Sequence, residues 1–91
     1  MVCIINGLKY DSATSRELYC GGDLQTMTRA NGRLTLYRSP KGTVWATLYY
    51  WVSETADRLE TCAGEAAVRR LCEGLNNARA IEAAFGKIEE G

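Results

Sequence analysis

Histidine is absent from this chain of 91 residues, and proline occurs only once. Histidine is the side chain that most often moves protons at neutral pH, so its absence removes the commonest general acid–base chemistry. The chain also lacks the glycine-rich motifs that bind nucleotide phosphates and the aspartate-rich loop that binds calcium. We therefore expect a protein that is not an enzyme and that binds no cofactor.

Long apolar runs are also missing. No segment approaches the roughly 18–20 apolar residues that a membrane-spanning helix needs. The first ten residues, MVCIINGLKY, contain no basic stretch ahead of a long apolar run, which is the pattern of a secretory signal. These absences predict no membrane partner and a cytoplasmic location, and the length predicts a single domain over residues 1–91.

The four cysteines are spaced too widely for a typical metal site. Structural zinc sites usually draw on closely paired ligands, and no CxxC motif occurs here. A zinc ion held by all four thiolates is one alternative, and disulfides, which suit secreted chains, are another. We expect no metal and instead buried free thiols at Cys3, Cys20, Cys62 and Cys72.

Opposite charges balance over the whole chain but not within each half. Residues 1–50 carry six basic and three acidic residues, a balance of +3. Residues 51–91 carry five basic and eight acidic residues, a balance of −3. Such an asymmetry bears on the choice of partner rather than on the fold.

The first ten residues predict a β-hairpin. Val2–Ile5 is rich in β-branched residues, and Leu8–Tyr10 can return as its partner strand. Asn6-Gly7 between them is the strongest short signal for a two-residue hairpin turn, because both residue types tolerate positive φ.

A short helix is expected after this hairpin. Asp11 or Ser12 can accept hydrogen bonds from the free amides of a first helical turn. The apolar face is weak, so we expect the helix to extend only to about Tyr19. Gly21-Gly22 should end it, because glycine adopts the left-handed conformation at low cost.

Three strands should follow as an antiparallel meander, over Leu24–Ala30, Arg33–Ser39 and Thr43–Ser53. Asn31-Gly32 joins the first two, and a proline–glycine turn at residues 39–42 joins the second to the third. Connections this short allow no crossover, so neighbouring strands must run antiparallel.

The remainder of the chain predicts mainly helices. Arg58–Thr61 is a candidate edge strand, and from Ala63 the apolar residues recur at helical spacing. Gly74 and Asn76-Asn77 break this pattern, and a last helix is expected over Ala78–Phe85. The predicted class is α+β: a small antiparallel sheet of three to five strands, built from an N-terminal hairpin and a meander, with one short helix after the hairpin and two C-terminal helices.

The longest strand is apolar on both faces, which raises the question of what covers the second face. Side chains alternate along a strand. The face expected beneath the C-terminal helices carries Val44, Ala46, Leu48, Tyr50 and Val52, with Leu34 and Leu36 beside them. The second face carries Trp45, Thr47, Tyr49 and Trp51, with Thr35 and Tyr37 beside them.

The second face is predicted to be a docking surface. Tyrosine and tryptophan combine a large contact area with a polar tip, and interfaces are enriched in them. Basic residues flank these aromatic residues and can add charge complementarity to a partner. The predicted partner-binding residues are Arg33, Tyr37, Arg38, Lys41, Trp45, Tyr49 and Trp51.

Three alternatives to a foreign protein are open for this face. The N-terminal hairpin and helix can fold over it, or a second copy of the chain can pair with it as a homodimer. Nucleic acid is the third, because the segment from Leu24 to Ser53 holds four basic side chains, five aromatic ones and no acidic one. A pI near 6.2 argues against nucleic acid, since such modules usually carry a clear basic excess.

Short motifs along most of the chain resemble a family of small proteins from phages and mobile elements. The similarity is carried by ING with KYDSATSREL, by TLYRSPKGTVWATLY, by GEAAVRRL and by the closing AAFGKIEEG. Members of that family typically show a GKxYDTxTA start, an LYRTKKGxWFL hairpin and a last helix ending near FGxIEEA. These motifs indicate a capped helix, a tight hairpin and a docked C-terminal helix rather than a chemistry.

The resemblance implies an accessory binding protein. Some small proteins of this size and source are anti-CRISPR inhibitors, so the expected function is to block a Cas effector subunit of the bacterial host by direct contact. This chain departs from the family pattern at Tyr49–Ser53, where a glycine-rich run is expected, so a function housed there does not carry over. The alternative function is a small nucleic-acid-binding regulator that uses the basic aromatic hairpin.

Overall fold

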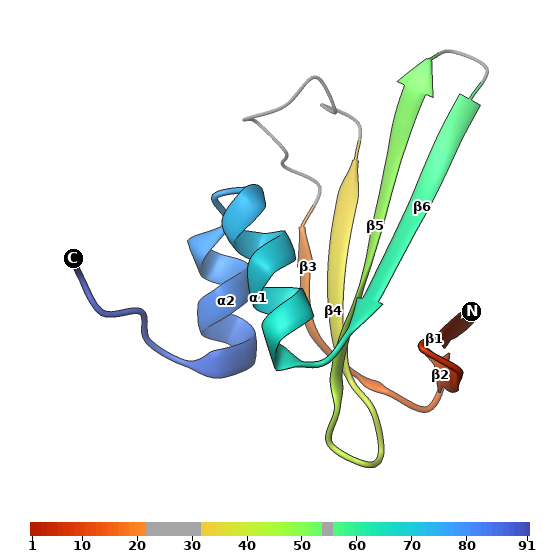
Figure 1. Ribbon diagram of the computed structural model, residues 1–91, viewed down its shortest axis with the longest axis horizontal. Coiled ribbons are helices and arrows are strands. Elements are labelled where there is room, and N and C mark those ends of the chain that lie inside the picture. The colour runs from red at the N-terminus through yellow and green to blue at the C-terminus, as the bar shows by residue number, and fades with distance from the viewer. Residues whose placement is uncertain (22–31, 54–55) are drawn as a thin grey trace.

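The computed structural model describes residues 1–21, 32–53 and 56–91, and for residues 51–53 and 56 it describes the backbone alone. Within those ranges the chain forms a two-stranded and a four-stranded sheet, both antiparallel, and two helices. Figure 1 shows the helices on one side of the larger sheet and the two-stranded sheet on the other. The α+β class is therefore confirmed.

The smaller sheet is the predicted N-terminal hairpin. Strand β1 (Val2–Ile5) pairs with β2 (Leu8–Asp11) through a turn in which Asn6 has φ 52° and Gly7 has φ 79°. Two consecutive positive φ values match the right-handed twist of the flanking strands, which is why asparagine and glycine are favoured there. The turn signal in the sequence thus located this element correctly.

The helix predicted from Asp11 or Ser12 to Tyr19 is wrong. The Asp11 carboxylate does accept a hydrogen bond from the Ala13 amide at 3.0 Å, which is the start of a helix-like turn. The chain then continues as strand β3 (Arg16–Gly21), and its leucine and tyrosine side chains pack against the main core. A capping interaction contributes only about 1 kcal/mol, so strand pairing and burial decide the structure of this segment.

The larger sheet runs in chain order from β3 to β6. Strands β4 (Arg33–Arg38), β5 (Val44–Ser53) and β6 (Ala56–Ala63) form the meander, each antiparallel to the next. The edge strand predicted at Arg58–Thr61 is confirmed, and it is longer than expected because its pairing with β5 continues to the start of α1.

The meander begins with a different strand from the one predicted. One edge of β4 pairs with β5 and the other pairs with β3, so neither edge is open to the predicted strand over Leu24–Ala30. That segment lies outside the described residues, as do Gly22 and the Asn31 position of the predicted turn. The first neighbour of β4 therefore comes from the segment expected to be a helix.

Helices α1 (Glu65–Gly74) and α2 (Ala78–Phe85) pack on one face of the sheet, as predicted. The Asn77 side chain caps α2 by accepting a hydrogen bond from the Ala80 amide at 3.1 Å. Within the described residues, neither helix has the length and apolar character needed to span a bilayer. The buried residues of the main core are Leu34, Leu36, Val44, Ala46, Leu48, Tyr50, Val68, Cys72, Leu75, Ala80, Ile81 and Ala84.

Candidate functional site

The second face of the larger sheet has a covered half and an open half. The N-terminal hairpin packs over the end of the sheet that lies nearest the β4–β5 turn (Figure 1). A second apolar cluster forms between the hairpin and the sheet, and its buried residues are Cys3, Ile5, Tyr10 and Trp45. The N-terminal hairpin of the chain itself therefore covers this half of the second face.

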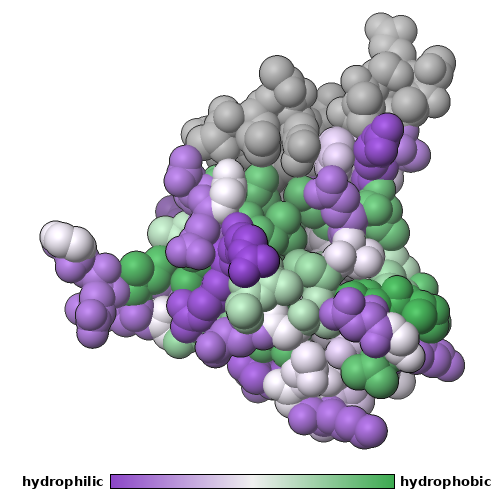
Figure 2. All heavy atoms as spheres, in the orientation of Figure 1, coloured by the Kyte–Doolittle hydropathy of each residue, from purple (hydrophilic) through white to green (hydrophobic). Residues whose placement is uncertain are grey.

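The hairpin buries one of its own faces in this contact and leaves the other to solvent. Figure 2 shows hydrophobic side chains gathered around the hairpin, at the right of the view. On the solvent-facing side, Val2 is exposed at 52% and Ile4 at 68%. Such one-sided burial is usual for antiparallel strands that pack against a core.

Trp45 is fully enclosed in the covered half. Its exposed fraction is 0%, and its ring stacks on Tyr37 at 4.4 Å between centroids and packs at a tilt on Tyr10 at 5.6 Å. The indole N–H donates to the Ser15 hydroxyl at 3.1 Å, so the polar edge of the ring is satisfied as well. In this position Trp45 belongs to the core and presents no surface to a partner.

The open half forms a hollow of about 390 Å³, which we name the open groove. Its lining residues are Met1, Glu17, Cys20, Arg33, Thr35, Tyr37, Thr47, Tyr49 and Leu59. Three of its apolar side chains are exposed, Met1 at 55%, Leu59 at 50% and Tyr49 at 38%. Apolar side chains that gather in one exposed hollow indicate a binding surface more strongly than scattered ones do.

Polar and charged groups line one side of the open groove. The Arg33 guanidinium lies 3.8 Å from the Cys20 sulfur, and the Thr35 hydroxyl donates to the same sulfur at 3.7 Å. Glu17 supplies the acidic charge of this side. The groove therefore combines an apolar centre with one charge of each sign.

The two tyrosines of the open groove are held in place by their neighbours. The Tyr49 hydroxyl donates to the Asp57 carboxylate at 2.7 Å, and Tyr37 is stacked on the buried tryptophan. Burial, with the nearby charge of Glu17 as the next cause, raises the pKa of Tyr37 above its ordinary value of 10.0. Its surroundings therefore favour the protonated hydroxyl.

Two of the remaining predicted residues, Arg38 and Lys41, lie outside the open groove. The Arg38 guanidinium donates to the carbonyls of Gly42 at 3.1 Å and Ala84 at 3.2 Å, so it ties the β4–β5 turn to the end of α2. Lys41 lines a separate cleft beside the N-terminal hairpin. The side chain of Trp51 lies outside the described part of the chain. The six predicted residues with described side chains are thus divided among the open groove, the buried cluster under the hairpin and two other places in the fold.

Sequence reasoning missed Met1, Glu17 and Leu59 as lining residues. Leu59 lies directly opposite Tyr49 in the β5–β6 register. The sequence indicates it only as a single apolar residue between charged ones in the predicted edge strand. Glu17 fell in the segment predicted to be a helix, so its place on the sheet was hidden. Met1 reaches the groove only because the hairpin packs on this face, which no local pattern indicates.

The four thiols are free, but they are not all buried as expected. Cys3 and Cys72 are buried, Cys62 is half-buried, and Cys20 is exposed because it lies on the edge strand β3. Burial, with Cys62 and Glu73 as further causes, raises the pKa of Cys72 from 9.0 to about 11. Burial also raises the pKa of Cys62. A nucleophilic cysteine needs a shift in the opposite direction.

Comparison of the chain with protein-family models, with curated proteins and with solved structures finds no match. The resemblance to small phage proteins, and the function that it implies, therefore stay predictions. In the part of the chain that the structure describes, no three histidine, cysteine, aspartate or glutamate residues come together as a potential metal site. The open groove is thus an exposed hollow with an apolar centre and charged residues on one side.

Proposed function

We propose that the chain is a non-enzymatic binding protein that docks on a partner protein through the open groove. The observation that carries this proposal is the joint exposure of Met1, Tyr49 and Leu59 on a sheet face whose other half is packed by the hairpin. Burial raises the pKa of the Cys62 and Cys72 thiols, which disfavours a nucleophilic role for these two residues.

The make-up of the open groove favours a protein partner. An aromatic and aliphatic centre with a polar border is the usual anatomy of a protein interface, and Arg33 and Glu17 supply the border charges. A surface for nucleic acid needs several cations that follow a phosphate backbone. Among the described basic residues, Arg38 is engaged with two carbonyls and Lys41 lines a different hollow.

The proposed target is a Cas effector subunit of the bacterial host, which the protein would inhibit by occupying one of its surfaces. This part of the proposal rests on the resemblance to small proteins of phages and mobile elements. Interface energy concentrates in a few aromatic and arginine side chains at the centre of the contact. Tyr37, Tyr49 and Arg33 are therefore the proposed anchors, with Leu59 and Met1 as apolar contacts.

Affinity capture from a CRISPR-active bacterial lysate tests the proposal. The tagged protein is incubated with lysate, with and without nuclease, and the retained proteins are identified by mass spectrometry. The expected result is a Cas subunit that is retained after nuclease treatment. Capture that disappears with nuclease would instead show binding through nucleic acid and would overturn the proposal.

A pair of matched variants locates the contact. Leu59→Asp places a charge in the apolar centre of the groove, and we expect it to weaken binding of the captured subunit at least about thirtyfold, the factor that corresponds to ~2 kcal/mol at an interface hot spot. Ile88→Asp is the control, because Ile88 is also an exposed apolar residue, at 38%, and does not line the groove. Equal losses in both variants, or none in Leu59→Asp, would reject the groove as the contact.

A further inference from the structure

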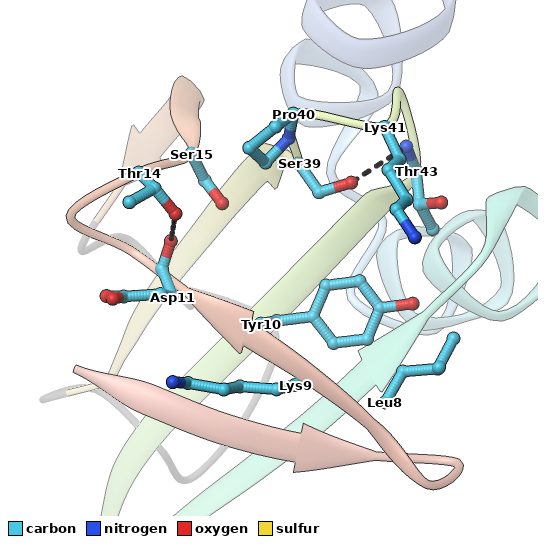
Figure 3. A pocket seen from close by; sticks show the side chains of 10 residues that line it. All are labelled: Leu8, Lys9, Tyr10, Asp11, Thr14, Ser15, Ser39, Pro40, Lys41 and Thr43. Atoms are coloured by element: carbon cyan, nitrogen blue, oxygen red, sulfur yellow. Dashed lines mark hydrogen bonds between the residues drawn. The ribbon is translucent and has the colours of Figure 1, made fainter.

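A second hollow lies between the N-terminal hairpin and the β4–β5 turn, and we name it the hairpin cleft (Figure 3). Its volume is about 480 Å³, and it shares no lining residue with the open groove. Small-molecule sites typically measure roughly 300–1,000 Å³. The hairpin cleft is therefore large enough for a small ligand and separate from the proposed protein contact.

Two ammonium groups of the hairpin cleft have no partner among the described residues. Lys9 comes from β2 and Lys41 from the β4–β5 turn, and neither makes an ion pair or hydrogen bond there. Asp11 is the one carboxylate that lines the cleft, and one of its oxygens already accepts from the Ala13 amide. Figure 3 shows the ammonium of Lys41 near the hydroxyl of Tyr10, with the Asp11 carboxylate at the other end. The Lys41 end therefore carries uncompensated positive charge.

Three hydroxyl groups add donors to the same hollow. The Ser15 oxygen accepts from the Trp45 indole, and the Ser39 oxygen accepts from the Thr43 amide, each at 3.1 Å. A hydroxyl that accepts through a lone pair still has its own proton to donate. The Tyr10 hydroxyl also has no hydrogen bond to another described residue. The cleft is thus rich in donors with no assigned acceptor.

Apolar walls complete the hairpin cleft. Leu8 is exposed at 60% although it points to the same side of the hairpin as buried Ile5, its partner across the turn. Pro40 lies on the opposite wall, and Figure 3 shows the Tyr10 ring between these two walls. A ligand here would place an anionic group near Lys41 and an apolar group against Leu8 and Pro40.

From this arrangement we infer that the hairpin cleft binds a small phosphomonoester that carries a compact apolar body. A phosphomonoester has close to two negative charges at neutral pH and three acceptor oxygens, which matches an excess of cations and several free hydroxyl protons. Lys41 pairs with the phosphate, and the Ser39 and Tyr10 hydroxyls donate to its oxygens. The inference rests on the hairpin cleft alone and holds whether or not the open groove binds a protein.

An NMR titration of the full ¹⁵N-labelled chain tests the inference with three probes at constant ionic strength. Phenyl phosphate carries both the anion and the apolar body, inorganic phosphate carries only the anion, and phenol carries only the body. We expect saturable shifts at the amides of Lys41, Gly42 and Thr43 with phenyl phosphate, at an affinity at least about tenfold higher than for either other probe. No saturable shift with phenyl phosphate would overturn the inference.

A matched pair of lysine variants separates a built site from general attraction to positive charge. Lys41→Ala should weaken phenyl phosphate binding about tenfold, because it removes a charge-assisted hydrogen bond. Lys87→Ala is the control, since Lys87 is exposed and does not line the hairpin cleft. Equal affinity in Lys41→Ala and the parent chain, or equal affinity for phenol and phenyl phosphate, would also overturn the inference.

The same variant distinguishes this inference from the proposed function. Lys41 does not line the open groove, so Lys41→Ala should leave capture of the protein partner unchanged while it weakens phenyl phosphate binding. Loss of both would mean that the two hollows form one site, which contradicts the separate cleft inferred here.

Discussion

At the scale of single residues, Trp45 and Tyr49 show how position along one strand decides a role. Both belong to the second face of β5, and both are aromatic residues with a polar tip. The hairpin covers Trp45 completely, whereas Tyr49 stays exposed at 38% in the open groove. The first residue therefore contributes to stability, and the second is one of the proposed contacts of the open groove.

Replacing Trp45 with alanine should destabilise the fold strongly. Removal of a large buried aromatic side chain leaves a cavity, and the expected cost is about 3–5 kcal/mol in the free energy of unfolding. Urea denaturation followed by circular dichroism measures this value. Tyr49→Ala is the comparison, and it should cost no more than about 1 kcal/mol, because the ring is exposed at 38% and its hydrogen bond to Asp57 lies at the surface. Equal costs would show that Tyr49 also belongs to the core.

Cys72 should make stability depend on pH in the alkaline range. Its thiol has a pKa of about 11 in the folded chain against an ordinary 9.0, so folding favours the protonated form. This contribution is fully present below pH 9 and is lost as the pH rises toward about 11.

The measurement is the free energy of unfolding of the parent chain and of Cys72→Ala across this range. We expect the variant to lose less stability than the parent chain between pH 9 and about 11. Parallel curves for the two proteins would contradict a buried, protonated thiol at this position. Cys62 is a second contributor in the same direction, since burial raises its pKa too.

At the scale of elements, the segment after the hairpin shows why a local signal was misleading. Asp11 makes the side-chain contact expected of a helix cap, yet Arg16–Gly21 forms a strand. Strand β3 is stabilised by its pairing with β4 and by packing on the main core. Both β4 and the core residues are distant from β3 in the sequence. A residue-by-residue pattern does not contain this information, which is why Glu17 was missed in the groove.

The N-terminal hairpin should be sensitive to substitution at its turn glycine. Gly7 has φ 79° with no atom near the position of an added Cβ, so Gly7→Ala introduces backbone strain without a clash. The expected cost is about 1 kcal/mol in the free energy of unfolding. Gly74→Ala is a matched control, because Gly74 also has open space but lies in α1 without a positive φ.

In the control, alanine should stabilise the helix by roughly 0.5 kcal/mol, since glycine is the poorer helix former. Urea titrations of both variants against the parent chain give the two values. The same sign of effect at Gly7 and Gly74 would contradict the left-handed conformation of the hairpin turn.

At the scale of the whole molecule, burial rather than ion pairing holds the fold together. The described residues contain one ion pair, between Arg69 and Glu65 at 3.8 Å on the surface of α1. Their side chains are 43% and 68% exposed, and pairs of this kind contribute at most about 0.5 kcal/mol. Among the described residues, no ion pair joins the basic first half of the sequence to the acidic second half.

Stability should accordingly respond little to salt. Raising sodium chloride from about 20 mM to about 500 mM screens surface charges, and we expect the free energy of unfolding to change by less than about 1 kcal/mol. Glu65→Gln removes the ion pair without changing the size of the side chain and should be nearly neutral. A large loss of stability in high salt would point to charge networks beyond the described pair.

The sequence by itself determined the elements whose signals lie within a few residues. The hairpin turn at Asn6-Gly7, the long strand β5 and the two C-terminal helices are where local pattern placed them, because turn chemistry and apolar periodicity act over short distances. The alternation along β5 also assigned the correct face to the main core.

Only the tertiary structure decided what lies on the other face. The hairpin covers Trp45 but not Tyr49. How much of this face it covers depends on how β1 and β2 pack against β5, which lies some forty residues later in the chain. The same docking brings Met1 to the open groove and builds the hairpin cleft against the β4–β5 turn. Long-range packing, which no short sequence pattern records, therefore created both candidate binding sites.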